Sequence, residues 1–316
     1  MASKQLSIVE LREHLMRSLK DELDAAQHCN TIIVSSELIH SRLRSADEIA
    51  RLLRFFDGYV DRISLVVFLR RQDRLAVSNF SASLRAGYAN FDGVFVDRSS
   101  HRFLRTGSCA EPNDYVDFYD FNKLLDRFSS FVAKADTHTF LFEDDVRSKS
   151  PHVYRITDIA NVPRSALQVS GAPLNQSLTL EQQYAFCQVN RVAPITLKNG
   201  RRNKGLKAIH GKIEETIGGG RRTFPRADAK AFLERFSDSN EAVRAAYFPD
   251  REVLFEADFE AYPETVEPFI PDENTKATAD KFAALAQLLS DDERTSKQAF
   301  QYVKNKVRSI IGLRAF

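Results

Sequence analysis

The sequence is poor in the residues that mark several specialised protein classes. Its 316 residues include 12 glycines, 10 prolines, three cysteines and no tryptophan. The low glycine and proline content excludes a collagen-like or low-complexity chain. Cys29, Cys109 and Cys187 lie far apart and form no CxxC pair, so they indicate neither a disulfide framework nor a zinc site.

Neither charge of one sign nor a long apolar run dominates the chain. The 45 basic and 43 acidic residues give a net charge of +2, which offers nucleic acid no general attraction. No run approaches the roughly 18 apolar residues of a membrane span, and the N-terminus lacks the apolar stretch of a signal peptide. We therefore expect a cytoplasmic protein with no nucleic-acid partner and no integral membrane segment.

The first half of the chain alternates between helical and strand-like patterns. Apolar positions recur at helical spacing in residues 5–27, from about 37 to 56, and in residues 73–85 and 120–134. Two apolar runs predict buried strands, at residues 31–34 and 63–69, and residues 137–142 are a third candidate strand. Buried strands separated by helices predict an α/β fold, with a parallel sheet flanked by helices.

The second half is predicted to be mostly helical. Helices are expected at residues 179–190, 203–217, 226–236 and 238–247, with two more after Thr275. The prolines between Tyr262 and Thr275 favour a linker. We expect an α/β domain over residues 1–260, a linker over 261–275 and C-terminal helices over 276–316.

Charged and hydroxyl residues follow two of the predicted strands, at the sheet edge where parallel sheets bind ligands. The sequence Ser-Ser-Glu follows the first strand at residues 35–37, and Arg70 and Arg71 follow the second, with Ser78 in the next helix. Such an arginine and hydroxyl can bind a phosphate, because guanidinium is a forked donor and a helix N-terminus supplies N–H groups. The alternative is a surface arginine pair with a serine that faces solvent.

The segment VVFLRRQDRLAVS, residues 66–78, resembles the 3′-phosphate-binding motif of sulfotransferases that use 3′-phosphoadenosine 5′-phosphosulfate. That motif is an apolar strand, an arginine, and a serine eight positions later in a helix. Weaker similarity to bacterial sulfotransferase-like proteins of polysaccharide and lipopolysaccharide modification extends patchily over about residues 5–260. The resemblance implies a P-loop-type sheet, with Arg70 and Ser78 on the 3′-phosphate and Arg71 as a secondary ligand.

One part of the family pattern is missing. Sulfotransferases begin with a strand and a loop of the form Lys-x-Gly-Thr around the 5′-phosphosulfate, and nothing like it precedes Thr31. We expect that the start lies upstream, that the chain is a fragment, or that the loop has been lost. The Lys- and Gly-rich segment at residues 197–205 is a distant substitute that lacks the threonine.

Basic residues are concentrated between Arg191 and Arg226. Ten Lys and Arg against two Glu give this segment a charge of +8 and leave about −6 for the rest of the chain. The concentration favours an anionic ligand. In the resembled family a late basic loop with glycine completes the 3′-phosphate site, which implies that role for Arg221 and Arg222 after the glycines at 218–220. A solvated basic connector is the alternative.

The resemblance also implies a general base. Related carbohydrate sulfotransferases place a catalytic glutamate just past a strand end, which is the position of Glu37, and His40 one helical turn later is the second choice. The alternative for Glu37 is a first-turn glutamate that stabilises the helix dipole. No residue is a good candidate for the cation that neutralises the leaving phosphate.

Other catalytic motifs are missing, namely GxSxG, HExxH, GxGxxG and GxxxxGK[ST]. The acidic run at residues 143–145 is expected to be a solvated strand exit, and His101, His138 and His152 lack partners at ligand spacing. We therefore expect no metal cofactor.

These patterns favour a sulfotransferase-like protein that transfers a sulfuryl group from 3′-phosphoadenosine 5′-phosphosulfate to a hydroxyl of a saccharide or glycolipid. One alternative is a truncated or degenerate relative that binds a nucleotide or glycan without turnover. Another is a helical interaction protein whose arginines are ordinary surface charges.

Overall fold

The computed structural model describes residues 7–26, 28–89, 114–147, 152–167, 177–197 and 202–290. Contacts divide the chain into two compact units, each made of several chain segments. Unit 1 comprises residues 1–69, 120–170 and 242–249, and unit 2 comprises residues 70–119, 171–241 and 250–316. Each unit is described by itself below.

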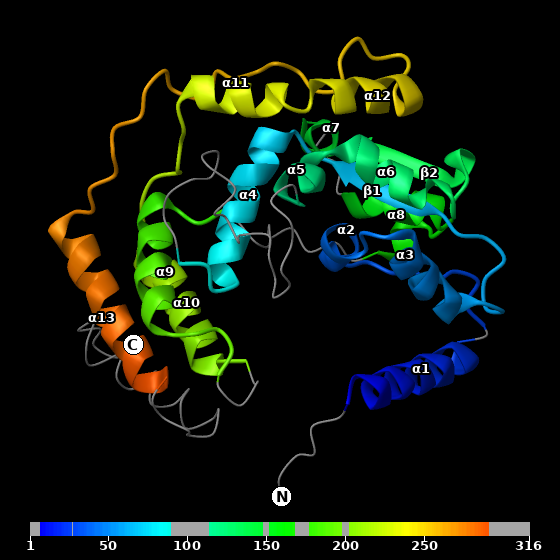
Figure 1. Ribbon diagram of the computed structural model, residues 1–316, viewed down its shortest axis with the longest axis horizontal. Coiled ribbons are helices and arrows are strands. Elements are labelled where there is room, and N and C mark those ends of the chain that lie inside the picture. The colour runs from blue at the N-terminus through cyan, green and yellow to red at the C-terminus, as the bar shows by residue number, and fades with distance from the viewer. Residues whose placement is uncertain are drawn as a thin grey trace, which may run out of the picture. The chain divides into compact units, whose positions relative to one another are not determined.

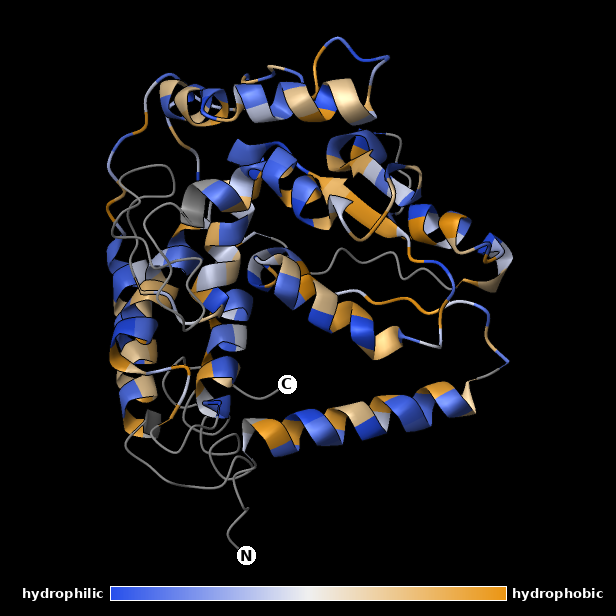
Figure 2. Cartoon of the chain, turned by 45° about the vertical axis from the view of Figure 1, so that its right-hand side comes forward, coloured by the Kyte–Doolittle hydropathy of each residue, from blue (hydrophilic) through white to orange (hydrophobic). Residues whose placement is uncertain are grey.

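Unit 1 contains a parallel pair of strands, β1 (Leu65–Leu69) and β2 (Thr137–Leu141) (Figure 1). The register runs from Leu65 opposite Thr137 to Leu69 opposite Leu141. β1 is apolar throughout (Figure 2), whereas β2 is apolar only at its last two residues, and the last residue of each strand is buried. The predictions of strands at 63–69 and 137–142, and of their parallel pairing in an α/β fold, are confirmed.

The remaining described elements of unit 1 are helices. They are α1 (Ile8–Ala25), α2 (Glu37–Arg42), α3 (Ala46–Leu53), η1 (Arg54–Phe56), α6 (Phe121–Ser129), η3 (Lys134–Asp136), α7 (Phe142–Arg147), α8 (His152–Ile159) and η4 (Arg164–Ala166). Capping boxes begin α1 at Ser7 and Glu10 and α3 at Ser45 and Glu48. The cap at Ser45 explains why the helical pattern expected from about 37 to 56 is broken into two helices.

The predicted strand at residues 31–34 is wrong. These residues form neither helix nor strand, and the side chains of Ile33 and Val34 are 54% and 50% exposed. β-branched residues favour a strand only when a neighbouring strand supplies hydrogen bonds and packing. Within the described part of unit 1 the sheet has two strands, so this run has no such neighbour.

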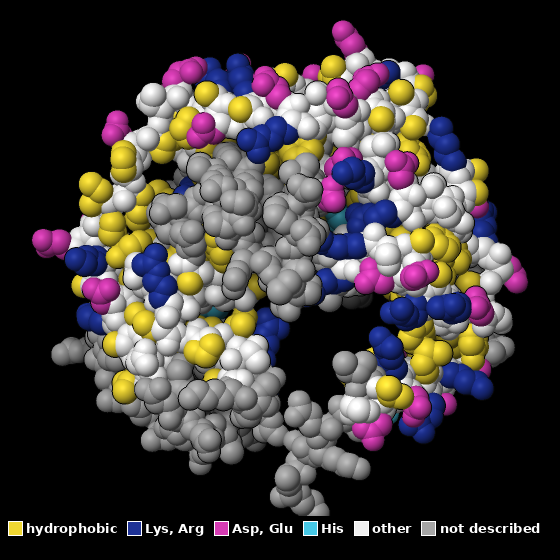
Figure 3. Space-filling view, viewed as in Figure 1, with side chains coloured by type: hydrophobic (Ala, Val, Ile, Leu, Met, Phe, Trp, Pro, Cys, Tyr) yellow, Lys and Arg dark blue, Asp and Glu magenta, His cyan; other side chains and the backbone are white. Residues whose placement is uncertain are grey.

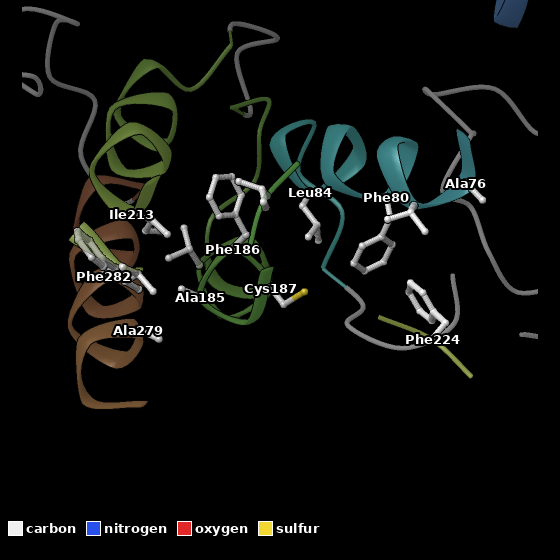
Figure 4. Packing of buried hydrophobic residues seen from close by; sticks show 14 of the residues in the cluster. Ala76, Phe80, Leu84, Ala185, Phe186, Cys187, Ile213, Phe224, Ala279 and Phe282 are labelled. Atoms are coloured by element: carbon white, nitrogen blue, oxygen red, sulfur yellow. The ribbon is translucent and has the colours of Figure 1, made fainter. Parts of the chain in front are cut away.

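Unit 2 is helical. Its elements are α4 (Gln72–Arg85), α5 (Asp114–Tyr119), α9 (Leu180–Val192), α10 (Lys204–Thr216), α11 (Arg226–Glu234) and α13 (Glu273–Ser290), and α12 (Ser237–Tyr247) is shared with unit 1. α9 packs against α4, α10 and α13. One apolar cluster joins these helices, with Leu84 of α4, Phe186 and Cys187 of α9 and Phe282 of α13 among its members (Figure 4). The helices expected in the second half are thus confirmed up to α13, and the last predicted helix lies outside the described residues.

The turn after α4 brings two backbone segments close together. Gly87 has a φ of +95°, and a Cβ atom there would lie 3.0 Å from the Cβ of Ile195. Only glycine fits both requirements, because an L side chain is strained at that φ and has no room. The predicted end of this helix near Gly87 is confirmed.

Basic and acidic side chains are interspersed on the face shown in Figure 3, which agrees with the small net charge of the chain. None of the helices in the described ranges combines the length and the apolar character needed to cross a membrane.

Candidate anion-binding site

Arg70 and Ser78 occupy the local structure that the motif predicts. The chain leaves β1 at Leu69, Arg70 follows, and α4 begins at Gln72. Ser78 lies in the second turn of α4, and both Arg70 and Ser78 are half-buried. The strand, the helix and the position of the serine within it therefore agree with the sequence-based expectation.

Arg71 has a different environment from its neighbour. Its side chain is 2% exposed, and its Nε and Nη2 donate to the two carboxylate oxygens of Asp73 at 2.8 Å each. Its Nη1 donates to the carbonyl of Glu256 at 2.7 Å, and its Cζ lies 4.6 Å from the centroid of the Phe259 ring. Burial alone would lower the pKa of Arg71, but the hydrogen bonds and charge of Asp73 outweigh burial and raise it. Arg71 thus stays charged as part of the packing around the start of α4.

Two further contacts hold the first turn of α4. Gln72 and Asn240 exchange side-chain hydrogen bonds at 2.6 and 3.2 Å. The Tyr262 hydroxyl donates to Asp73 at 2.7 Å, and burial together with this carboxylate raises the pKa of Tyr262. All three residues that follow Arg70 are therefore fixed by buried polar contacts, which holds the backbone beside Arg70 in place.

The glycine-rich loop at residues 218–220 packs against the start of α9. The N–H of Leu180 donates to the carbonyl of Gly220 at 2.9 Å, and Arg221 forms a backbone bridge with Thr179. Gly219 has a φ of +143°, and a Cβ atom there would lie 1.6 Å from Oε2 of Glu181. A side chain at this position would be strained by the φ and would displace the Glu181 side chain, so glycine suits the loop where it lies against α9.

Arg222 connects this loop to α4. Its Cζ lies 4.9 Å from the centroid of the Phe80 ring and 5.2 Å from that of the Phe224 ring, and both rings are labelled in Figure 4. Its Nη1 donates to Oε1 of Gln183 at 3.2 Å. The rings and the amide hold a half-buried cation beside Phe80, which is two residues beyond Ser78.

α9 also touches α4 near the same place. The N–H of Leu178, just before α9, donates to the hydroxyl of Ser81 at 3.1 Å, and both residues are buried. Within unit 2 the structure thus brings together the serine-bearing part of α4, the start of α9 and the Gly-Arg loop. Arg221, in contrast, is exposed.

The predicted bases belong to unit 1. Glu37 is the first residue of α2, and it follows closely on the run at residues 31–34. The structure describes only the backbone of Glu37. His40 lies in the same helix and is half-buried. The five predicted ligands Arg70, Arg71, Ser78, Arg221 and Arg222 belong to unit 2.

Sequence reasoning missed a polar cluster in unit 1 made of Asp145, His152 and Arg155. The acidic run at 143–145 was expected to be solvated, but Asp145 is 1% exposed. The signal available in the sequence was weak, because the partners lie seven and ten residues further along the chain.

No protein-family model matches the chain, and neither the curated proteins nor the solved structures contain a match. Among the residues that the structure describes, no group of three or more His, Cys, Asp or Glu is arranged to hold a metal ion.

Proposed function

We propose that the chain is a sulfotransferase-like protein with a P-loop-type sheet. It binds 3′-phosphoadenosine 5′-phosphosulfate as co-substrate and transfers the sulfuryl group to a hydroxyl of a saccharide or glycolipid. The observation that carries the proposal is the contact of Arg222 with Phe80, because it joins the late Gly-Arg loop to the helix that bears Ser78. These are the two chain segments that the resembled family uses for the 3′-phosphate.

Arg70 and Ser78 are the proposed primary ligands. Arg70 stands between a strand end and a helix start, where the guanidinium can donate two parallel hydrogen bonds to phosphate oxygens. The Ser78 hydroxyl adds a neutral donor. The buried contacts of residues 71–73 keep the backbone beside Arg70 fixed, which lowers the entropy lost on binding.

Arg222 supplies the second cation. Partial burial between Phe80 and Phe224 keeps the guanidinium in one orientation and strengthens its attraction for an anion relative to a fully solvated arginine. Exposed Arg221 adds to the positive field of the segment between Arg191 and Arg226 and is the weaker ligand of the two.

The transfer step resembles phosphoryl transfer. The acceptor oxygen forms a bond to sulfur while the bond from sulfur to the 5′-phosphate oxygen breaks, and adenosine 3′,5′-bisphosphate leaves. The acceptor proton goes to a general base, for which Glu37 and His40 stay the predicted residues. The protein contributes chiefly by positioning the partners and neutralising charge.

The test is transfer of ³⁵S from the labelled co-substrate to a panel of saccharides and glycolipids. We expect transfer by the unaltered protein and a loss of about tenfold or more in Arg70→Ala and Ser78→Ala. Arg235→Ala, an exposed arginine of the same unit, is the matched control and is expected to keep full activity.

Two results would change the proposal. Binding of the co-substrate that depends on Arg70, without transfer to any acceptor, would favour the non-catalytic relative that binds a nucleotide. Absence of both binding and transfer in the unaltered protein would overturn the proposal.

A further inference from the structure

A buried carboxylate in unit 1 holds a histidine in one orientation. Asp145 of α7 is 1% exposed, and its Oδ2 lies 2.9 Å from Nδ1 of His152, the first residue of α8. Its other oxygen, Oδ1, accepts from Nε and Nη2 of Arg155 at 3.0 and 2.9 Å. The carboxylate thus has partners on both oxygens, and both partners come from the same helix.

These contacts determine the tautomer of the imidazole. Burial alone would raise the pKa of Asp145, but the hydrogen bonds from His152 and Arg155 outweigh burial and lower it, so the group is an ionised acceptor. An ionised carboxylate has no proton to donate, and therefore Nδ1 of His152 must carry the hydrogen. In the neutral ring the lone pair is then on Nε2, at the edge away from Asp145.

Packing against two aromatic rings also restrains the imidazole. The imidazole stacks on Phe142, with centroids 4.3 Å apart and planes at 29°, and meets Phe68 edge to face at 5.3 Å. The side chain of His152 nevertheless stays 32% exposed. An oriented imidazole with solvent access is the form in which histidine accepts protons in catalysis.

The position of His152 relative to the sheet favours ligand binding. Phe68 is the penultimate residue of β1, and α7 with Phe142 and Asp145 begins directly after β2. His152 therefore lies at the carboxyl end of the parallel pair, where open parallel sheets bind their ligands.

We propose that His152 is a catalytic proton acceptor for hydroxyl compounds, alcohols or water, and that Asp145 is its positioning residue. As the hydroxyl oxygen bonds to the carbonyl carbon of an ester, its O–H bond breaks and the proton passes to Nε2. The bond from that carbon to the ester's alcohol oxygen then breaks, and the alkoxide or phenolate leaves. The resulting imidazolium is balanced by Asp145 until the proton is released to solvent. This site stands on contacts within unit 1 alone and does not depend on co-substrate binding.

The first test is the tautomer of His152 in the full-length protein. Two-dimensional ¹H–¹⁵N correlation spectra above neutral pH are expected to show His152 with hydrogen on Nδ1, the signal being assigned by its loss in His152→Gln. Glutamine keeps a donor for Asp145, so this variant is expected to fold. A ring with hydrogen on Nε2 would overturn the proposal.

The second test is the hydrolysis of 4-nitrophenyl acetate, in which water attacks the ester carbonyl and 4-nitrophenolate leaves. The protein-dependent rate is expected to fall by about tenfold or more in His152→Gln. His14→Gln, on the exposed surface of α1, is the matched control and is expected to keep the rate. Equal rates in His152→Gln and the unaltered protein, or no protein-dependent hydrolysis at all, would overturn the proposal.

Asp145→Asn separates positioning from structure. The amide can donate to Nδ1 and reverse the tautomer, so the rate is expected to fall together with the Nδ1–H signal. Circular dichroism reports whether each variant is folded. If Asp145→Asn does not fold, His152→Gln decides the question alone.

Discussion

The imidazole Nε2 of His210 lies 2.8 Å from the side-chain oxygen of Asn190, and both residues are buried. The Asn190 amide nitrogen donates to the carbonyls of Leu84 and Tyr88 at 2.8 and 2.7 Å, so its oxygen must be the acceptor and His210 the donor. The pair thereby joins α9 and α10 to the end of α4.

This pair predicts a loss of stability in mild acid. Burial, and then the nearby charge of Arg85, lower the pKa of His210 to about 4, against about 6.5 in the unfolded chain. The unfolded state therefore binds the extra proton first, and the stabilisation present above about pH 6.5 is lost as the pH falls toward 4. Urea unfolding at pH 7.5, 5.5 and 4.5 is expected to show a drop of up to about 1.4 kcal/mol per pH unit from this group.

His210→Gln is the comparison protein for that measurement. It lacks the titrating ring, so its stability is expected to vary less between pH 6.5 and 4.5. An identical pH dependence in both proteins would contradict the assignment to His210.

The glycine at 219 is predicted to be required for the packing of the loop against α9. Gly219→Ala would place a Cβ against Glu181 at a φ that L residues rarely adopt, and is expected to destabilise the protein by about 1–2 kcal/mol. Gly218→Ala is the matched control, because a Cβ there meets nothing within 4 Å. Thermal melting of the two variants is the measurement, and equal midpoints would show that the contact does not matter.

Two ion pairs at the start of α4 are predicted to differ greatly in importance. Asp73→Asn leaves the buried Arg71 without its counter-charge and is expected to cost about 3 kcal/mol or more. Arg74→Ala removes a half-exposed partner of Asp258 and is expected to cost less than about 1 kcal/mol. Urea unfolding at pH 7 compares the two, and similar losses would mean that burial does not set the strength of these pairs.

Hydrophobic spacing in the sequence predicted those helices and strands whose packing or pairing partners are present in the fold. β1 was predictable because it is an apolar run, and it has β2 as its pairing partner. α4 was predictable because its apolar spacing ends near Gly87. The run at residues 31–34 has the same local signal, but propensity does not tell whether a neighbouring strand is present.

The candidate sites were predictable in part. Arg70 and Ser78 are eight positions apart in one strand–helix segment, so the sequence contains their spacing. The burial of Arg71 and the packing of Arg222 against Phe80 depend on residues more than a hundred positions away, which no local pattern contains. Asp145 and His152 are only seven positions apart, but the orientation of His152 depends on how α7 and α8 pack, which the residue spacing does not reveal.

Arg70 and Ser78 are proposed to bind the 3′-phosphate of an adenine nucleotide. Calorimetric titration with adenosine 3′,5′-bisphosphate tests this proposal, with adenosine 5′-monophosphate as the ligand that lacks the 3′-phosphate. We predict binding of the bisphosphate at about 1 μM, or about −8 kcal/mol, and a loss of about tenfold or more in Arg70→Ala but not in Arg235→Ala. Equal affinity for the two nucleotides, or equal binding by the unaltered protein and Arg70→Ala, would contradict the claim.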